Sequence, residues 1–133
     1  MSLGNASVVR STVPDQTEVR GVWTGGGAAT DCSRATGDAN KGIISFKYNA
    51  ATGKYRVTLT DVGQQILDAT CNVSRVSGSI PLSANVIRGS LNVANKTVDI
   101  EFWSVAAGAH TLTDLAATDK VLVTIVFTKN QPN

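Results

Sequence analysis

Histidine and cysteine are scarce in this chain, and their scarcity excludes several kinds of site. Among the 133 residues there are one histidine, His110, and two cysteines, Cys32 and Cys71. Two thiols without C-x-x-C spacing and one imidazole cannot complete a zinc site without help from carboxylates. A Ser-His-Asp catalytic triad or a Cys-His dyad would have to use His110, and no G-x-S-x-G motif is present. The sequence therefore predicts no metal centre, no cofactor and no enzyme.

Long apolar runs and concentrated charge are missing as well. Nowhere does the chain approach the roughly 18 consecutive apolar residues of a membrane-spanning helix, and its first residues lack the pattern of a signal peptide. The net charge is +2, and the 12 lysines and arginines are scattered. Because DNA-binding proteins gather such residues on one face, we expect neither a nucleic-acid partner nor a membrane partner.

The two cysteines leave their own pairing open. Cys32 and Cys71 could form one disulfide in an exported protein, but two free thiols in a reducing compartment are the simpler expectation. Cys71 alternates with Leu67, Ala69 and Val73. This alternation predicts that Cys71 is a small, buried core residue.

Alternation of apolar and polar residues is the dominant pattern. Residues 54–60 place Tyr55, Val57 and Leu59 on one face and polar side chains on the other, as in a half-buried strand. Residues 120–127 are apolar on both faces, which predicts a central strand or one buried between two layers. Further strands are expected at residues 18–23, 43–48, 67–73, 85–93 and 97–103.

The remaining signals also favour strands over helices. In one predicted strand Ile44, Phe46 and Tyr48 share a face. Asp61 followed by Gln64 resembles a capping box, which predicts at most one short helical turn. About eight short strands separated by turn-rich segments predict an all-β fold, an antiparallel β-sandwich with a jelly-roll-like pattern.

Residues 48–55, with the sequence YNAATGKY, contain a possible phosphate-binding motif. A Walker loop requires G-x-x-x-x-G-K-[ST] followed by a helix. Here Tyr48 stands where the first glycine should be, Tyr55 follows the lysine, and a strand comes next. The segment is therefore predicted to be a hairpin turn, in which Gly53 supplies the positive φ.

Two long irregular segments, residues 24–42 and 104–119, are expected to be functional or mobile. The first begins with a glycine run in which Gly25 and Gly27 match G-x-G. Thr30 stands where a dinucleotide fingerprint needs its third glycine, and no βαβ unit follows. We interpret this run as a flexible loop.

Four aspartates in these segments are candidate ligands for Ca²⁺, namely Asp31, Asp38, Asp114 and Asp119. A calcium loop needs several oxygen ligands close together, as in D-x-D-x-D. Neither Asp31 with Asp38 nor Asp114 with Asp119 has that spacing. We therefore expect Asp114 and Asp119 to accept hydrogen bonds from the turn backbone.

Asp99 and Glu101 lie at i, i+2 on one strand face, and a glycosidase would draw its paired carboxylates from these two residues. Many solvated strand carboxylates share that spacing. Basic residues on a neighbouring strand would explain both as cross-strand ion pairs.

The aromatic residues offer a last kind of site. Trp23, Trp103 and Tyr55 could form a platform for stacking sugars, although aromatics near strand ends also serve in cores and subunit interfaces. His110 lies in a loop, where a lone histidine is usually solvated. Trp23, Trp103 and His110 are the candidate interface or ligand contacts.

Three stretches together carry a resemblance to a known class of proteins: KGIISFKYNAATGKYRVTLTD, QQILDATCNV and VDIEFWSVAAGAHTLTDLAATDKVLVTIVF. The pattern resembles small structural proteins of tailed bacteriophages, in which a G-x-Y-x-V-x-L run precedes a D-L-x-x-x-D-x-l-x-v-x-[IV] segment. The similarity covers roughly residues 41–128. The second motif is matched here by Asp114, Leu115, Asp119, Val121, Val123 and Ile125.

The resemblance implies a non-enzymatic virion component of the head, its decoration or the tail. The G-x-Y-x-V-x-L run also occurs in C1q- and TNF-like jelly rolls, and all these families imply an antiparallel sandwich that assembles as a trimer or higher ring. The implied partners are further copies of this chain and other virion proteins. The implied location is the virion, after synthesis in the cytoplasm of a host bacterium, with no cofactor.

The expected organisation is an N-terminal arm, residues 1–18, followed by one β-sandwich domain, residues 19–133. Such arms often pair with the sheet edge of a neighbouring subunit. An alternative from another class is a small lectin-like or other ligand-binding module. A third, weaker alternative is a small hydrolase that uses His110.

Overall fold

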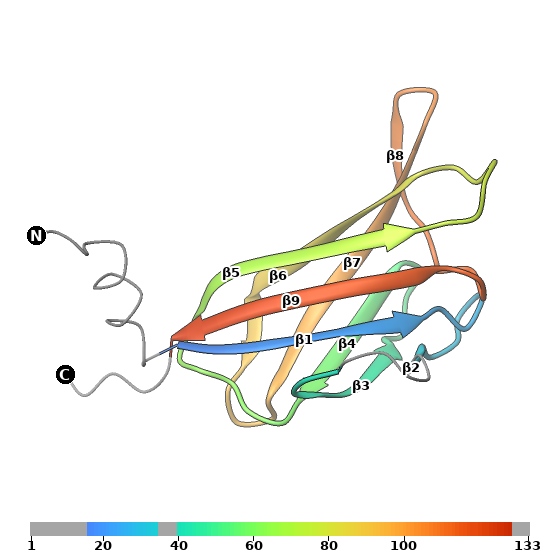
Figure 1. Cartoon of the computed structure of the whole chain (residues 1–133). Helices are drawn as coiled ribbons and strands as arrows, with labels where there is room; N and C mark the ends of the chain where they lie inside the picture. The colour runs from blue at the N-terminus through green and yellow to red at the C-terminus, as the bar shows by residue number, and fades with distance from the viewer. Residues whose placement is uncertain (1–15, 35–39, 129–133) are drawn as a thin grey trace, which may run out of the picture.

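The computed structural model describes residues 16–34 and 40–128, and in these residues the chain is all-β. The described strands form two antiparallel sheets that pack face to face (Figure 1). The predicted all-β antiparallel sandwich is confirmed, with nine strands in place of about eight. The described residues include no helix long and apolar enough to span a membrane.

The first sheet has the strand order β2-β1-β9-β5 and the second has the order β3-β4-β7-β6. In the second sheet β8 pairs with the end of β7 that lies beyond β4. The β7–β8 hairpin extends past the body of the sandwich (Figure 1). The strands are β1 (Gln16–Thr24), β2 (Ser33–Arg34), β3 (Ile43–Tyr48), β4 (Lys54–Leu59), β5 (Ile66–Ser74), β6 (Leu82–Asn92), β7 (Thr97–Ala106), β8 (Ala109–Leu112) and β9 (Lys120–Thr128).

The arm expected at residues 1–18 falls mainly outside the described residues. Only its end, from Gln16 onward, is described, and it forms the first part of β1. The predicted strand at residues 120–127 is β9, which pairs with β1 on one side and with β5 on the other. β9 is thus a central strand, as its apolar pattern predicts.

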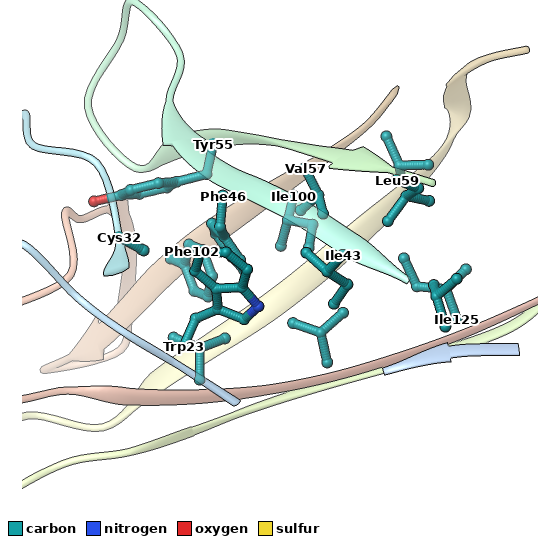
Figure 2. Close-up of a cluster of buried hydrophobic side chains, with 14 of the residues drawn as sticks. Trp23, Cys32, Ile43, Phe46, Tyr55, Val57, Leu59, Ile100, Phe102 and Ile125 are labelled. Carbon is teal, nitrogen blue, oxygen red and sulfur yellow. The ribbon is translucent and has the colours of Figure 1, made fainter. Parts of the chain in front are cut away.

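The core between the sheets consists of the alternate side chains that point inward. Four aromatic rings meet there (Figure 2), with centroids 5.3 Å apart for Tyr55 and Phe102 and 6.1 Å apart for Trp23 and Phe46. Offset and edge-to-face pairs of this kind add about 0.5–1.5 kcal/mol each to their burial. The fully buried aliphatic residues around them are Val57, Leu59, Val98, Ile100, Leu115, Val121, Val123 and Ile125.

Two β-bulges overturn the predicted orientation of two apolar residues. The register of β3 against β4 shifts between Ile43 and Ser45, so Ile44 is an extra residue and is 59% exposed. The register of β5 against β9 shifts between Ile66 and Asp68, and Leu67 is 41% exposed. A bulge interrupts the period of two, so neither residue lies on the core face that strict alternation assigned to it.

The predicted hairpin at residues 48–55 is confirmed, because Tyr48 lies opposite Tyr55 across β3 and β4. Gly53 has φ of +75°, and its amide donates a 2.7 Å hydrogen bond to Asp114. The expected helical turn after Asp61 is absent: the described chain runs irregularly there.

Replacing Gly53 with alanine tests this turn. The positive φ costs an L residue about 1–2 kcal/mol, and a Cβ would lie 2.7 Å from the amide nitrogen of Thr113. Gly53→Ala should therefore lower the free energy of unfolding in urea by more than Gly108→Ala. Gly108 is the matched control, since its φ is +78° and a Cβ there meets nothing within 4 Å. Equal losses for the two variants would contradict the packing explanation.

Candidate functional site

The outer face of the second sheet carries two of the three predicted contact residues. On β7 Val98, Ile100 and Phe102 are buried. Because side chains alternate along a strand, Glu101 and Trp103 point outward. The outer face is thus built from the residues between the core positions.

Strand pairing brings Trp103 and His110 together. Trp103 lies opposite Ser83 of β6 on one side and Leu112 of β8 on the other. The prediction that His110 lies in a loop is wrong, because His110 belongs to β8. It lies two residues before Leu112 and therefore shares the face of Leu112. The result is a depression of about 330 Å³ lined by Ser83, Ala84, Asn85, Trp103 and His110. We call it the Trp103 depression.

Ser83 and Asn85 are site residues that the sequence did not single out. Both lie on β6, although the strand predicted at residues 85–93 included only Asn85, and only the register of β6 against β7 shows that they flank Trp103. The alternation of β6 could have placed them on an outward face, without showing which strand lies beside it.

The Trp103 depression has the composition of a small-molecule binding surface. It offers one partly exposed indole and three polar side chains, namely a hydroxyl, an amide and an imidazole. An aromatic face with a few placed hydrogen-bonding groups suits a ligand that is apolar on one side and polar at its rim.

Trp23, the third predicted contact, is a core residue. It is 4% exposed and packs against Phe46 between the sheets (Figure 2). The sequence left a core position, a subunit interface and a sugar platform open for Trp23, and the structure places Trp23 in the core. Tyr55 is also buried, and its hydroxyl accepts a 3.0 Å hydrogen bond from the amide of Leu115. Burial raises the pKa of Tyr55 to about 12.

Asp99 and Glu101 form cross-strand ion pairs, as one of the two interpretations predicts. Arg56 donates hydrogen bonds of 2.7 and 3.1 Å to the two carboxylate oxygens of Asp99. The Lys54 Nζ atom lies 3.8 Å from Glu101. The hydrogen bond to Asp99 raises the pKa of Arg56. Exposed pairs of this kind contribute little stability, about 0–1 kcal/mol.

Asp114 joins three parts of the chain at one end of the sandwich. Its Oδ1 atom accepts a 2.7 Å hydrogen bond from the amide of Gly53, and its Oδ2 atom accepts one of 3.0 Å from the amide of Ala29. Asp31 similarly accepts a 2.9 Å hydrogen bond from the amide of Tyr48. The described parts of the two long segments are therefore held by carboxylate–amide bonds.

Asp119 is buried, with 1% exposure. Its Oδ1 atom lies 2.9 Å from Nε of Arg75, and its Oδ2 atom accepts a 2.7 Å hydrogen bond from the amide of Ala116. Arg75 also donates a 2.6 Å hydrogen bond to the carbonyl of Ile80. The prediction that Asp114 and Asp119 bind the turn backbone is confirmed.

The other candidate groups do not converge on a metal. Asp38 lies outside the described residues. In the part of the chain that is described, no group of three or more His, Cys, Asp or Glu could hold an ion. Cys32 and Cys71 are free thiols. Burial raises the pKa of Cys32 and of Cys71 to about 12.

Comparison of the chain with models of protein families, with curated proteins and with solved structures finds no match. These comparisons therefore assign neither a family nor a phage origin. The surfaces of the sandwich are the remaining guide to function.

The Asp119–Arg75 pair can be tested by removing its carboxylate charge. Asp119→Asn leaves the Arg75 guanidinium largely buried without its counter-charge, so the free energy of unfolding should fall by about 3–5 kcal/mol. Asp99→Asn, in the exposed pair with Arg56, should cost about 1 kcal/mol or less. Urea unfolding of both variants checks the contrast, and a small loss for Asp119→Asn would overturn this role.

Proposed function

We propose that this chain is a non-enzymatic structural protein of a tailed-phage particle, which acts through homo-oligomeric contacts. The resemblance of residues 41–128 to phage structural proteins supports the proposal. An uncovered apolar strip on the outer face of the first sheet supports it independently.

The strip lies on β9 and its neighbour β1, and it is the observation that carries the proposal. Leu122 points away from the core and is 47% exposed, although β9 lies in the middle of its sheet. Val22 lies directly opposite Leu122 on β1. Val126 lies on the same outward face of β9, beyond Thr124. We call Val22, Leu122 and Val126 the outer strip.

An apolar strip on a central strand is useful to a protein that assembles. Covering one leucine side chain completely is worth about 1.5–3 kcal/mol, and symmetric contacts repeat this gain in every subunit. Alternating residues of β9 thus serve two layers, the core of the chain itself and a surface for a neighbour. We propose a trimer or higher ring that also contacts other virion proteins.

A lysine at position 122 tests the assembly. Leu122→Lys should weaken self-association by at least about tenfold, because about 1.4 kcal/mol of binding energy is a factor of ten. Light scattering on a sizing column, at two protein concentrations and under reducing conditions, measures the mass. Ile44→Lys is the matched control, since Ile44 is also an exposed apolar residue but lies on a strand of the other sheet.

The mass of the unaltered chain decides whether the proposal survives. A trimer, hexamer or larger ring that Leu122→Lys dissociates and Ile44→Lys leaves intact supports it. A monomer at both concentrations contradicts it and makes ligand binding the better explanation of the exposed surfaces.

A second candidate function is a lectin-like module that binds a sugar in the Trp103 depression. The specific observation in its favour is that Trp103 lies beside the polar side chains of Ser83, Asn85 and His110. A sugar ring could stack one face on the indole and place its hydroxyls toward these groups.

Glycan-array binding tests this second function. If the chain binds a glycan there, Trp103→Ala should reduce the affinity by about tenfold or more, because an aromatic contact is worth about 0.5–1.5 kcal/mol beyond its buried area. Val93→Ala removes an exposed apolar side chain outside the depression and should leave binding unchanged. Absence of glycan binding, or equal binding by Trp103→Ala, excludes a sugar site at this depression.

A further inference from the structure

The two long sides of the sandwich are not alike. On one side the sheets are bonded to each other: Arg20 of β1 exchanges backbone hydrogen bonds of 2.9 and 2.7 Å with Lys41, and the amide of Cys32 donates one of 2.9 Å to Phe46 of β3. On the other side, within residues 16–34 and 40–128, β5 pairs only with β9 and β6 pairs only with β7. The sandwich therefore resembles a barrel that is opened along one line, which we call the β5–β6 seam.

Side chains that point toward the core are left partly uncovered along this seam. On β5 the inward residues Ala69, Cys71 and Val73 are half-buried, whereas Val121, Val123 and Ile125, opposite them on β9, are fully buried. On β6 the half-buried inward residues are Leu82, Ala84 and Val86. The core is thus complete in its middle and incomplete where β5 and β6 face each other.

The seam contains a recess of about 230 Å³. It is lined by the apolar residues Ile66, Ala69, Cys71, Ala84 and Val86 and by the polar residues Asp68, Asn85 and Arg88. Connection 75–81 joins β5 and β6 at one end, and the recess lies toward the other. Two alanines in its wall leave room for side chains from outside. Among the described residues, no strand pairs with the backbone groups on the edges of β5 and β6 beside the recess, and an unpaired edge can accept an added strand.

The chain itself provides a segment suited to this recess. Fifteen residues precede Gln16, and they include the β-branched run SVVRSTV, residues 7–13. Extended at about 3.3 Å per residue, these fifteen residues reach about 50 Å. That is longer than β5, whose nine residues span about 30 Å at the same rise.

The position of Gln16 favours the seam of a second copy over that of the same chain. Gln16 pairs with Thr128 at the end of the first sheet, and a chain that continues in line with β1 leaves the sheet there. To enter its own seam it would have to reverse and cross the ends of β9 and β5. The amide of Gln64 already donates a 2.9 Å hydrogen bond to the carbonyl of Thr128 and so occupies the end of β9.

We propose that residues 7–13 of one copy add as a β-strand to the free edge of β5 in a second copy and place their alternate side chains in the recess of the β5–β6 seam. This inference rests on the proposed function, because it needs a homo-oligomer, and it names the segment and the acceptor through which the copies are linked.

Cys71 offers a direct test because it is one of the residues that line the recess. Single cysteines are placed at Val8, Val9, Arg10 and Ser11, one per variant, and the assembled full-length protein is oxidised with diamide. Non-reducing gel electrophoresis should show a product of two chains at alternate positions only, since successive strand side chains point to opposite faces. A second set of the same variants with Cys71→Ala should lose the product, which excludes a link through Cys32.

Several results would overturn the inference. A link that stays within one chain means that the segment fills its own seam. Equal linking at all four positions means that no strand forms. No link that depends on Cys71 means that the segment does not reach the recess.

Mass measurement separates this inference from the proposed function. The full-length chain and a variant that begins at Asp15 are compared by light scattering. If the full chain is an oligomer and the truncated variant is a monomer or dissociates at least tenfold more readily, the inference is supported. If both have the same oligomeric mass, only the inference fails. If the full chain is a monomer, the proposed function fails first, and the inference with it.

Discussion

The buried carboxylate of Asp119 is the constraint on which one end of this sandwich depends. It holds Arg75, in the connection between β5 and β6, and the amide of Ala116, in the segment that leads into β9. Its backbone carbonyl also accepts a 2.9 Å hydrogen bond from Gly25, just after β1. Three connections are thus joined at one residue. A buried charge without its partner is costly. Loss of the Asp119 carboxylate should therefore destabilise these connections together.

Besides the β5–β6 seam, the sandwich offers its two outer faces as surfaces for binding. The outer strip lies on the first sheet, and the Trp103 depression lies on the second sheet. Since the sheets pack through their inner faces, the two surfaces point in opposite directions. Contact with a neighbouring subunit through Leu122 therefore need not cover Trp103. The two faces can therefore make independent contacts.

Sequence patterns predicted the sandwich, the turn at Gly53, the central position of β9 and the structural role of Asp114 and Asp119. They were wrong about the faces of Ile44 and Leu67, because a bulge adds one residue and leaves no mark in the local alternation. They also missed Ser83 and Asn85 as neighbours of Trp103. That proximity depends on the register of β6 against β7, which is a long-range property that local patterns do not contain. The buried position of Trp23 was one of the alternatives left open.

The one-sided closure of the sandwich also has a consequence for its motions. Backbone hydrogen bonds join the two sheets on the β1–β3 side, whereas in the described part of the chain none links β5 to β6. Local opening costs least where the fewest backbone bonds and apolar contacts must be broken. β5 and β6 should therefore separate most easily at the end away from connection 75–81, where the recess lies. Such opening would increase the solvent exposure of the half-buried Cys71 well before solvent reached the rings around Phe46.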